Sequence, residues 1–146
     1  MINIRSKSEI LKLSKAAAVV RDLLNEIESL VKPGISTIDL DNFAEQFIIE
    51  NGAKPGFKGL YGFPSTLCIS INDEVVHGLP SNRILKDGDI VGIDVGSIFD
   101  GFYGDHAKTF AVGSISDDKE DLLRVTKECL HIGINEAKPG NRIGDI

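Results

Sequence analysis

The stretch DIVGIDVGSIFDGFYGDHAKTFAV, residues 89–112, predicts a β-hairpin that carries two aspartates. The first arm, residues 90–99, is rich in β-branched side chains, and the second, residues 102–112, carries aromatic residues and threonine, which are typical of strands. Between the arms stands Asp100-Gly101, a pair that accepts the positive φ required at both positions of a two-residue hairpin turn. The sequence therefore predicts two antiparallel strands joined by a tight turn.

The two-residue turn also fixes which residues of the hairpin face each other. It places Gly96 opposite Asp105, and Asp94 lies two positions before Gly96 on the same strand. Because side chains alternate between the two faces of a strand, Asp94 and Asp105 should share one face as diagonal neighbours, roughly 7–8 Å apart at the backbone. A slip of one residue would send them to opposite faces, so the turn decides the prediction.

Two carboxylates that face one space repel each other unless one binds a proton or a cation lies between them. Divalent metals suit the second case, and paired hydrolytic metals lie about 3.5–4 Å apart, a gap that a carboxylate can bridge. The alternative is a pair of solvent-facing aspartates on a half-exposed hairpin. Ile93 and Val95 flank Asp94 in an apolar strand, which favours the ligand interpretation without choosing the metal.

Composition is that of an ordinary soluble protein. The 146 residues suffice for one domain with a core, and 42% of them are hydrophobic and 26% charged. A net charge of −6 argues against DNA or an anionic membrane as the main partner. Two cysteines form no disulfide framework, and neither a signal peptide nor an apolar membrane span is present, so a reducing, cytoplasmic setting is expected.

Apolar spacing predicts three helices. The first begins at a capping box formed by Ser6 and Glu9 and ends at the KPG of residues 32–34. The second is capped by Ser36 and ends at Asn51-Gly52, and the third is capped by Ser116 and ends at a second KPG, residues 138–140.

Between the second helix and the hairpin, glycine, proline and aromatic residues dominate the stretch 52–64, which predicts a loop without regular structure. Its large apolar side chains would either line a pocket or plug the edge of the core. A short strand is expected at residues 66–71. The lone His77 that follows is by default a satisfied loop histidine, but Gly78 and Pro80 fix a turn that would place its imidazole at a strand end facing the hairpin.

A repeat suggests a two-fold design. VKPGISTIDL, residues 31–40, and AKPGNRIGDI, residues 137–146, share Lys, Pro, Gly and a later Asp, and each follows a long amphipathic helix. An interval of 106 residues (138 − 32) suits a duplicated half-domain better than a solenoid unit. Residues 1–146 are therefore expected to form a single domain in which a second pseudo-repeat begins near residue 117 and is cut at residue 146.

The run from Gly62 to Phe110 closely resembles the type I methionine aminopeptidases of bacteria. The resemblance rests on the KPG helix stop, the S-x-N-x-x-V-x-H-G-x-P segment at residues 70–80 and the two aspartates separated by ten residues, and it extends over essentially the whole chain. It implies an α+β fold of the pita-bread type, in which two pseudo-symmetric halves surround a curved antiparallel sheet with helices on its outer face.

The resemblance also implies roles for individual residues. Asp94 would chelate one of two divalent metal ions (Co, Mn, Fe, Ni or Zn), and Asp105 would bridge both. His77 would lie beside the scissile carbonyl, contact the substrate amide and stabilise the tetrahedral intermediate. Phe63 and Cys68 match positions that line the pocket for the substrate methionine side chain, and the further pocket positions fall on Phe57 and Leu60.

The implied activity is removal of the initiator methionine from nascent proteins whose second residue is small, through attack by a metal-bound hydroxide. The implied partner is therefore the N-terminal peptide of a nascent protein, and an association with the ribosome is a further expectation. Two alternatives stay open: a related pita-bread peptidase acting on X-Pro bonds, and a non-catalytic pita-bread module that binds peptides or proteins.

The remaining ligands of the family, one histidine and two glutamates, and a second substrate-contacting histidine are implied to lie beyond residue 146. His106 should point away from Asp105, and His131 falls on the third helix, so neither replaces them. Two carboxylates make a poor chelate, which predicts weak metal binding and little turnover by the chain alone. A half-sheet with an exposed edge predicts self-association. A fragment, a truncated product and one part of a split enzyme all fit this pattern.

Overall fold

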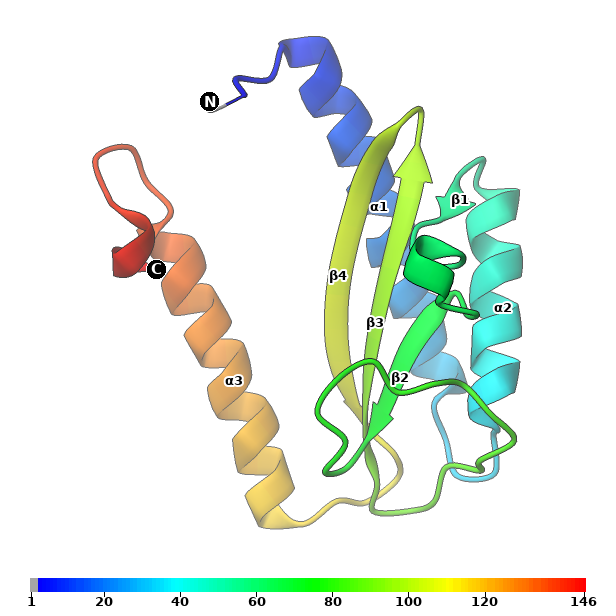
Figure 1. Ribbon diagram of the computed structural model, residues 1–146. Helices are drawn as coiled ribbons and strands as arrows, with labels where there is room; N and C mark the ends of the chain where they lie inside the picture. The colour runs from blue at the N-terminus through cyan, green and yellow to red at the C-terminus, as the bar shows by residue number, and fades with distance from the viewer. Residues whose placement is uncertain (1–2) are drawn as a thin grey trace. The chain divides into compact units, whose positions relative to one another are not determined.

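The hairpin lies in an antiparallel sheet in the computed structural model, which describes residues 3–146 (Figure 1). The chain divides into two units, the first ending at Ser114 and the second beginning at Ile115. The first unit contains, in order, α1 (Lys7–Leu30), α2 (Thr37–Glu50), β1 (Lys54–Pro55), η1 (Leu60–Gly62), β2 (Leu67–Ile71), β3 (Ile90–Phe99) and β4 (Phe102–Ala111). The second contains α3 (Asp117–Glu136) and η2 (Ile143–Asp145).

Strand β3 is the centre of the sheet. It pairs along its whole length with β4, Phe99 lies opposite Phe102, and Gly96 lies opposite Asp105, so the predicted register is confirmed. The turn residues Asp100 and Gly101 have φ of 48° and 81°, as a two-residue hairpin turn requires. On its other side β3 pairs first with β2 and then with β1, both antiparallel.

The first two helices cover one face of the sheet (Figure 1). Helix α1 packs on β3 and β4, and α2 packs on α1, β1 and β2. Most of the side chains buried between these layers are apolar; among the largest that are fully buried are Leu23, Leu24, Ile27, Leu40, Ile48, Leu67, Ile93 and Val95. Burial of such residues supplies most of the free energy that holds the helices on the sheet.

Helix α1 approaches the hairpin so closely that backbone meets backbone. The Ser97 hydroxyl donates a hydrogen bond to the carbonyl oxygen of Ala16 at 2.9 Å. A Cβ atom at Gly104, the residue opposite Ser97, would lie 2.4 Å from the carbonyl carbon of Ala16. Glycine at position 104 therefore sets the distance between α1 and β4.

The helix ends follow the predicted signals. Ser6 and Glu9 form a reciprocal capping box at the start of α1, and the Ser36 side chain accepts from the Asp39 amide at the start of α2. Ser116 occupies the predicted N-cap position of α3, but its side chain makes no capping hydrogen bond.

The loop prediction for residues 52–64 is wrong in part. Lys54 and Pro55 form the short strand β1 opposite Ile98 and Ser97, and Leu60–Gly62 form the 3₁₀ turn η1. A two-residue strand has no periodicity to detect, and its pairing is set by the neighbouring β3 rather than by its own sequence.

In the second unit α3 has the length expected from its apolar spacing. Its apolar residues Leu122, Val125 and Ile132 are 45–63% exposed. Across residues 3–146, no helix is both long and apolar enough to cross a membrane.

The two KPG sequences adopt the same local conformation. Gly34 and Gly140 have φ of 98° and 99°. In both, the lysine carbonyl accepts a hydrogen bond from the amide three residues later. The Ile35 amide donates to the Lys32 carbonyl at 3.3 Å, and the Asn141 amide donates to the Lys138 carbonyl at 3.1 Å. Proline followed by glycine with positive φ is the pattern of a type II turn, so the sequence repeat is also a repeat of turn geometry.

Candidate active site

Three strands bring their functional side chains to one face of the sheet. Asp94 lies opposite Ala107 in β4, two residues from Asp105, and opposite Cys68 in β2. Directly opposed residues of antiparallel strands share a face, so Cys68, Asp94 and Asp105 all project from the side of the sheet opposite to Ser97, which contacts α1. The predicted convergence of the two aspartates is thus confirmed by the register.

A pocket of about 170 Å³ opens on this face beside Asp94. Its lining comes from β2, β3, β4 and the segment after β2: Cys68, Ser70, Val75, Val76, His77, Gly92, Ile93, Asp94, Ala107, Lys108 and Thr109. Among the residues singled out from the sequence, it brings together Cys68, His77 and Asp94. Ser70 and Thr109 were missed, although counting by two from Cys68 and Asp105 along each strand identifies both.

His77 lies outside any strand, so its predicted place at a strand end is wrong, while its place beside the hairpin is confirmed by the pocket lining. The segment is held instead by Gly78, whose carbonyl accepts from the Ile69 amide at 2.8 Å and whose amide donates to the Ser70 hydroxyl at 3.3 Å. His77 itself has φ of 58°, an uncommon conformation for this residue, and its side chain is exposed.

Burial raises the pKa of the Asp94 carboxyl, and repulsion from Asp105 raises it further. The electrostatic interaction with His77 acts in the opposite direction and lowers the pKa of Asp94. Ionised Asp94 is therefore electrostatically unfavourable in the fold, and a cation placed between the two carboxylates would relieve the repulsion.

Asp94→Asn is expected to stabilise the metal-free protein at pH 7 by about 1 kcal/mol, in the range common for substitutions that remove an unfavourable functional group. The pKa of Asp94 is raised in the folded state. Protonated Asp94 therefore contributes fully to the stability of the folded protein below its unfolded-state pKa, and this contribution is lost as pH rises through the folded-state pKa. The advantage of the variant should therefore grow from pH 4 to pH 7. Urea unfolding with chelator present measures it, and a variant less stable than the wild type at pH 7 would contradict the expectation.

The thiol of Cys68 is neutral at physiological pH. Burial raises the pKa of this thiol to about 11, with further contributions from Asp94, Asp105 and Asp41. Because the thiolate is the reactive form of cysteine, Cys68 is suited to lining an apolar pocket and not to nucleophilic attack.

The other three predicted pocket residues lie on the loop between β1 and β2. The Phe57 ring covers Gly96, where a Cβ atom would lie 2.6 Å from its Cε1 atom. Leu60 is 46% exposed and Phe63 is half-buried. None of the three lines the 170 Å³ pocket, and of these three residues Phe57 is the one whose contact with β3 is established, through Gly96.

The two remaining histidines are His106 and His131. His106 lies opposite Val95, on the face opposite to Asp105, as the sequence predicted, and His131 is exposed on α3. Across residues 3–146 no group of three or more His, Cys, Asp or Glu side chains is arranged to hold a metal ion. The donors that fit a divalent cation are thus the two carboxylates.

Comparison with known proteins identifies the family of the chain. The model of metallopeptidase family M24 matches residues 12–146. The methionine aminopeptidase of Clostridium perfringens is 49% identical over 146 residues, which are 100% of this chain and 59% of that protein. The chain thus spans less than two thirds of the length of this curated relative.

Solved structures show the same fold. The crystal structure of a methionine aminopeptidase from Thermotoga maritima superposes with a TM-score of 0.96 at 41% identity, over 99% of this chain and 58% of that one. An Xaa-Pro dipeptidase from Bacillus anthracis has a TM-score of 0.79 at 28% identity, over 90% of this chain and 36% of that one. The expected pita-bread fold is therefore confirmed, and the chain belongs to metallopeptidase family M24.

Proposed function

We propose that this chain contributes the aspartate-bearing part of a methionine aminopeptidase site, which removes N-terminal methionine from nascent proteins. The observation that carries the proposal is the placement of Asp94 and Asp105 on one face, where Asp94 lines a pocket together with His77 and Cys68. The identity to methionine aminopeptidases supports this substrate over an Xaa-Pro substrate, since it exceeds the identity to the Xaa-Pro dipeptidase.

The family implies divalent metal, and the two carboxylates fit it, because burial and then repulsion from Asp105 raise the pKa of Asp94, and a cation would relieve the repulsion. Asp94 would hold one ion and Asp105 would contact two, with Co, Mn, Fe, Ni and Zn as candidates. A bound divalent ion acidifies water and polarises a peptide carbonyl.

The remaining residues would bind and orient the peptide. His77 is exposed at the pocket, where an imidazole N–H can donate to a substrate carbonyl oxygen and stabilise the negative charge that develops on it, or the unprotonated ring nitrogen can accept from a substrate amide N–H. The neutral Cys68 thiol would form part of the wall for the methionine side chain, and Phe57, Leu60 and Phe63 would supply further apolar contacts from the loop. The substrate implies the partner and the location. The partner would be the N-terminal peptide of a nascent protein, near the ribosome, and the location would be the cytoplasm.

The test combines hydrolysis with direct metal binding. After treatment with chelator, Mn²⁺ or Co²⁺ is added and methionine release from Met-Gly-Met is measured for the wild type and Asp94→Asn, with the exposed Asp118→Asn on α3 as a matched control. In parallel, Mn²⁺ should broaden NMR signals near Asp94 and Asp105. We expect weak, metal-dependent release that Asp94→Asn lowers at least about 100-fold while Asp118→Asn leaves it unchanged.

Each other outcome changes the conclusion. Broadening that depends on Asp94 without methionine release would support the metal site and contradict turnover by these 146 residues alone. Faster release from an X-Pro peptide than from Met-Gly-Met would favour the related X-Pro peptidase. Absence of both broadening and release would contradict the proposal and favour a non-catalytic binding module.

A further inference from the structure

Helix α2 presents two acidic side chains toward the loop that links β1 to β2. Asp41 and Glu45 are four residues apart, so they lie one above the other on the same side of the helix. Each contacts a different end of the loop. Neither residue belongs to the set of ligands and pocket residues described above.

Asp41 holds the C-terminal end of the loop. Its Oδ1 atom accepts hydrogen bonds from the amides of Thr66 at 2.9 Å and Leu67 at 2.7 Å. The residue is only 5% exposed, although it is a carboxylate in the interior of an otherwise apolar helix face. Burying a charge is costly, so these two hydrogen bonds to the start of β2 are the evident reason that an acid is accommodated there.

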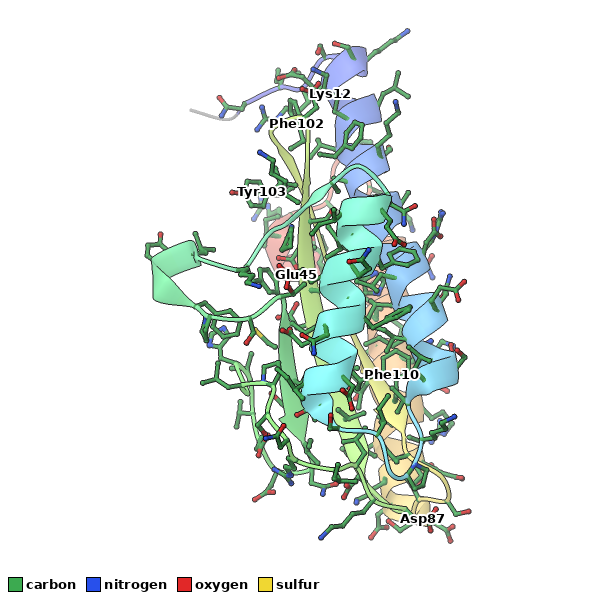
Figure 2. All side chains as sticks on the ribbon, turned by 90° about the vertical axis from the view of Figure 1, so that its right-hand side faces the viewer. Lys12, Glu45, Asp87, Phe102, Tyr103 and Phe110 are labelled. Carbon is green, nitrogen blue, oxygen red and sulfur yellow. The ribbon has the colours of Figure 1, made fainter. Side chains whose placement is uncertain are left out.

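Glu45 holds the N-terminal end. Its two carboxylate oxygens accept from the Lys58 ammonium at 2.8 and 2.7 Å. Figure 2 shows Glu45 on the side of α2 from which the loop carrying η1 projects. This ion pair is more exposed than Asp41, so we expect it to contribute less to holding the loop.

The loop leaves the sheet beside the proposed catalytic face. Leu67, the first residue of β2, lies opposite Val95 of β3, and at the following β3 residue the Gly56 amide donates to the Gly96 carbonyl at 2.8 Å. Phe57 packs on Gly96, and Cys68 directly follows the Leu67 amide that Asp41 binds. A shift of either loop end would therefore move side chains on both sides of Asp94.

We propose that Asp41 and Glu45 are positioning residues: from α2 they clamp both ends of the 57–66 loop and thereby set the shape of the pocket for the substrate side chain. The inference rests on the proposed function for the identity of that side chain, but the clamp itself does not require it. Asp41 carries most of the effect, because it is buried and binds the backbone at the first residues of β2.

The first readout is independent of catalysis. Asp41→Ala should raise amide exchange at Thr66 and Leu67 at least tenfold, while exchange at the core residue Ile93 stays unchanged. Asp41→Asn retains an acceptor oxygen at the same position and should restore most of the protection. Asn42→Ala, an exposed substitution on the same helix, is the matched control and should have no effect.

The second readout concerns the pocket. In a Cys129→Ser background, which removes the exposed thiol, iodoacetamide at one fixed pH should alkylate Cys68 at least tenfold faster in Asp41→Ala than in the wild type. Asp41→Asn should again restore the slow rate. Cys68 is only 5% exposed, and both substitutions remove the Asp41 charge that raises the pKa of its thiol, so fast alkylation in Asp41→Ala with slow alkylation in Asp41→Asn reports how tightly the start of β2 is held.

The third readout links the clamp to selectivity. For peptides beginning with Met or Leu, Asp41→Ala should raise KM for Met severalfold with kcat nearly unchanged, and should reduce the preference for Met. A wild type that releases no methionine would count against the proposed function, while the exchange and alkylation results would still decide the clamp.

Unchanged exchange at Thr66 and Leu67 in Asp41→Ala would overturn the clamp, and so would faster exchange with Cys68 alkylation unchanged. If Asp41→Ala does not fold, Lys58→Met removes the other contact. It should raise exchange at Gly59, whose amide donates to the Phe63 carbonyl at 2.7 Å, and wild-type protection there would then contradict the proposal.

Discussion

Gly104→Ala should destabilise the protein by about 3 kcal/mol, because the added methyl group would collide with the backbone of Ala16 rather than with a movable side chain. Helix α1 must then move off the hairpin, which also breaks the hydrogen bond from Ser97 to the Ala16 carbonyl. For a chain of this size the loss corresponds to a fall in Tm of about 10 °C. Thermal unfolding followed by circular dichroism measures it.

Gly92→Ala is the matched control for this experiment. Gly92 lies in the same hairpin, and a Cβ atom there would meet its nearest neighbours at 3.7 Å, an ordinary contact distance. We expect this variant to unfold within a few degrees of the wild type. Equal Tm values for Gly104→Ala and Gly92→Ala would show that α1 does not depend on the close approach at position 104.

A second large effect is expected for Gly78→Ala. A Cβ atom at this position would lie 2.0 Å from the carbonyl oxygen of Ile69, so the segment carrying His77 must leave the edge of β2. The hydrogen bond from the Ile69 amide to Gly78, 2.8 Å in the native protein, would be lost. If His77 contacts the substrate as proposed, methionine release should fall by about 100-fold, the lower end for loss of a positioned acid–base group.

Amide exchange distinguishes this outcome from general unfolding. Ile69 should lose protection in Gly78→Ala, whereas Ile93 in the neighbouring strand should keep it. Leu79→Ala changes an adjacent side chain that is 57% exposed and should behave as the wild type. Retained protection at Ile69 would mean that the backbone tolerates the methyl group and that the segment stays in place.

The hairpin and its two aspartates were predictable because local rules act on every residue involved. Asp100-Gly101 dictates a two-residue turn, the turn dictates the register, and the register puts Asp94 and Asp105 on one face. The caps at Ser6 and Ser36 were readable for the same reason, since donor and acceptor lie within three residues.

Features that depend on distant contacts were not predictable in this way. The pairing of Lys54 and Pro55 exists only because β3 offers a free edge at Ser97 and Ile98. The role of Asp41 depends on amides that lie 25 and 26 residues away along the chain. The sequence nevertheless contained a signal for this role, because a buried acid on the apolar side of a helix needs a hydrogen-bond partner.

One edge of β3 pairs with two different strands, β2 and then β1, and this arrangement has an evolutionary consequence. Because β2 covers residues 91–95 of that strand and β1 covers residues 97–98, the chain between them can be lengthened, shortened or replaced without altering the hairpin register. If the loop lines the substrate pocket as proposed, mutations in it would change which side chains are accepted while the carboxylates stay in place. Such a separation would allow one ancestral scaffold to diversify its selectivity without altering the carboxylate pair.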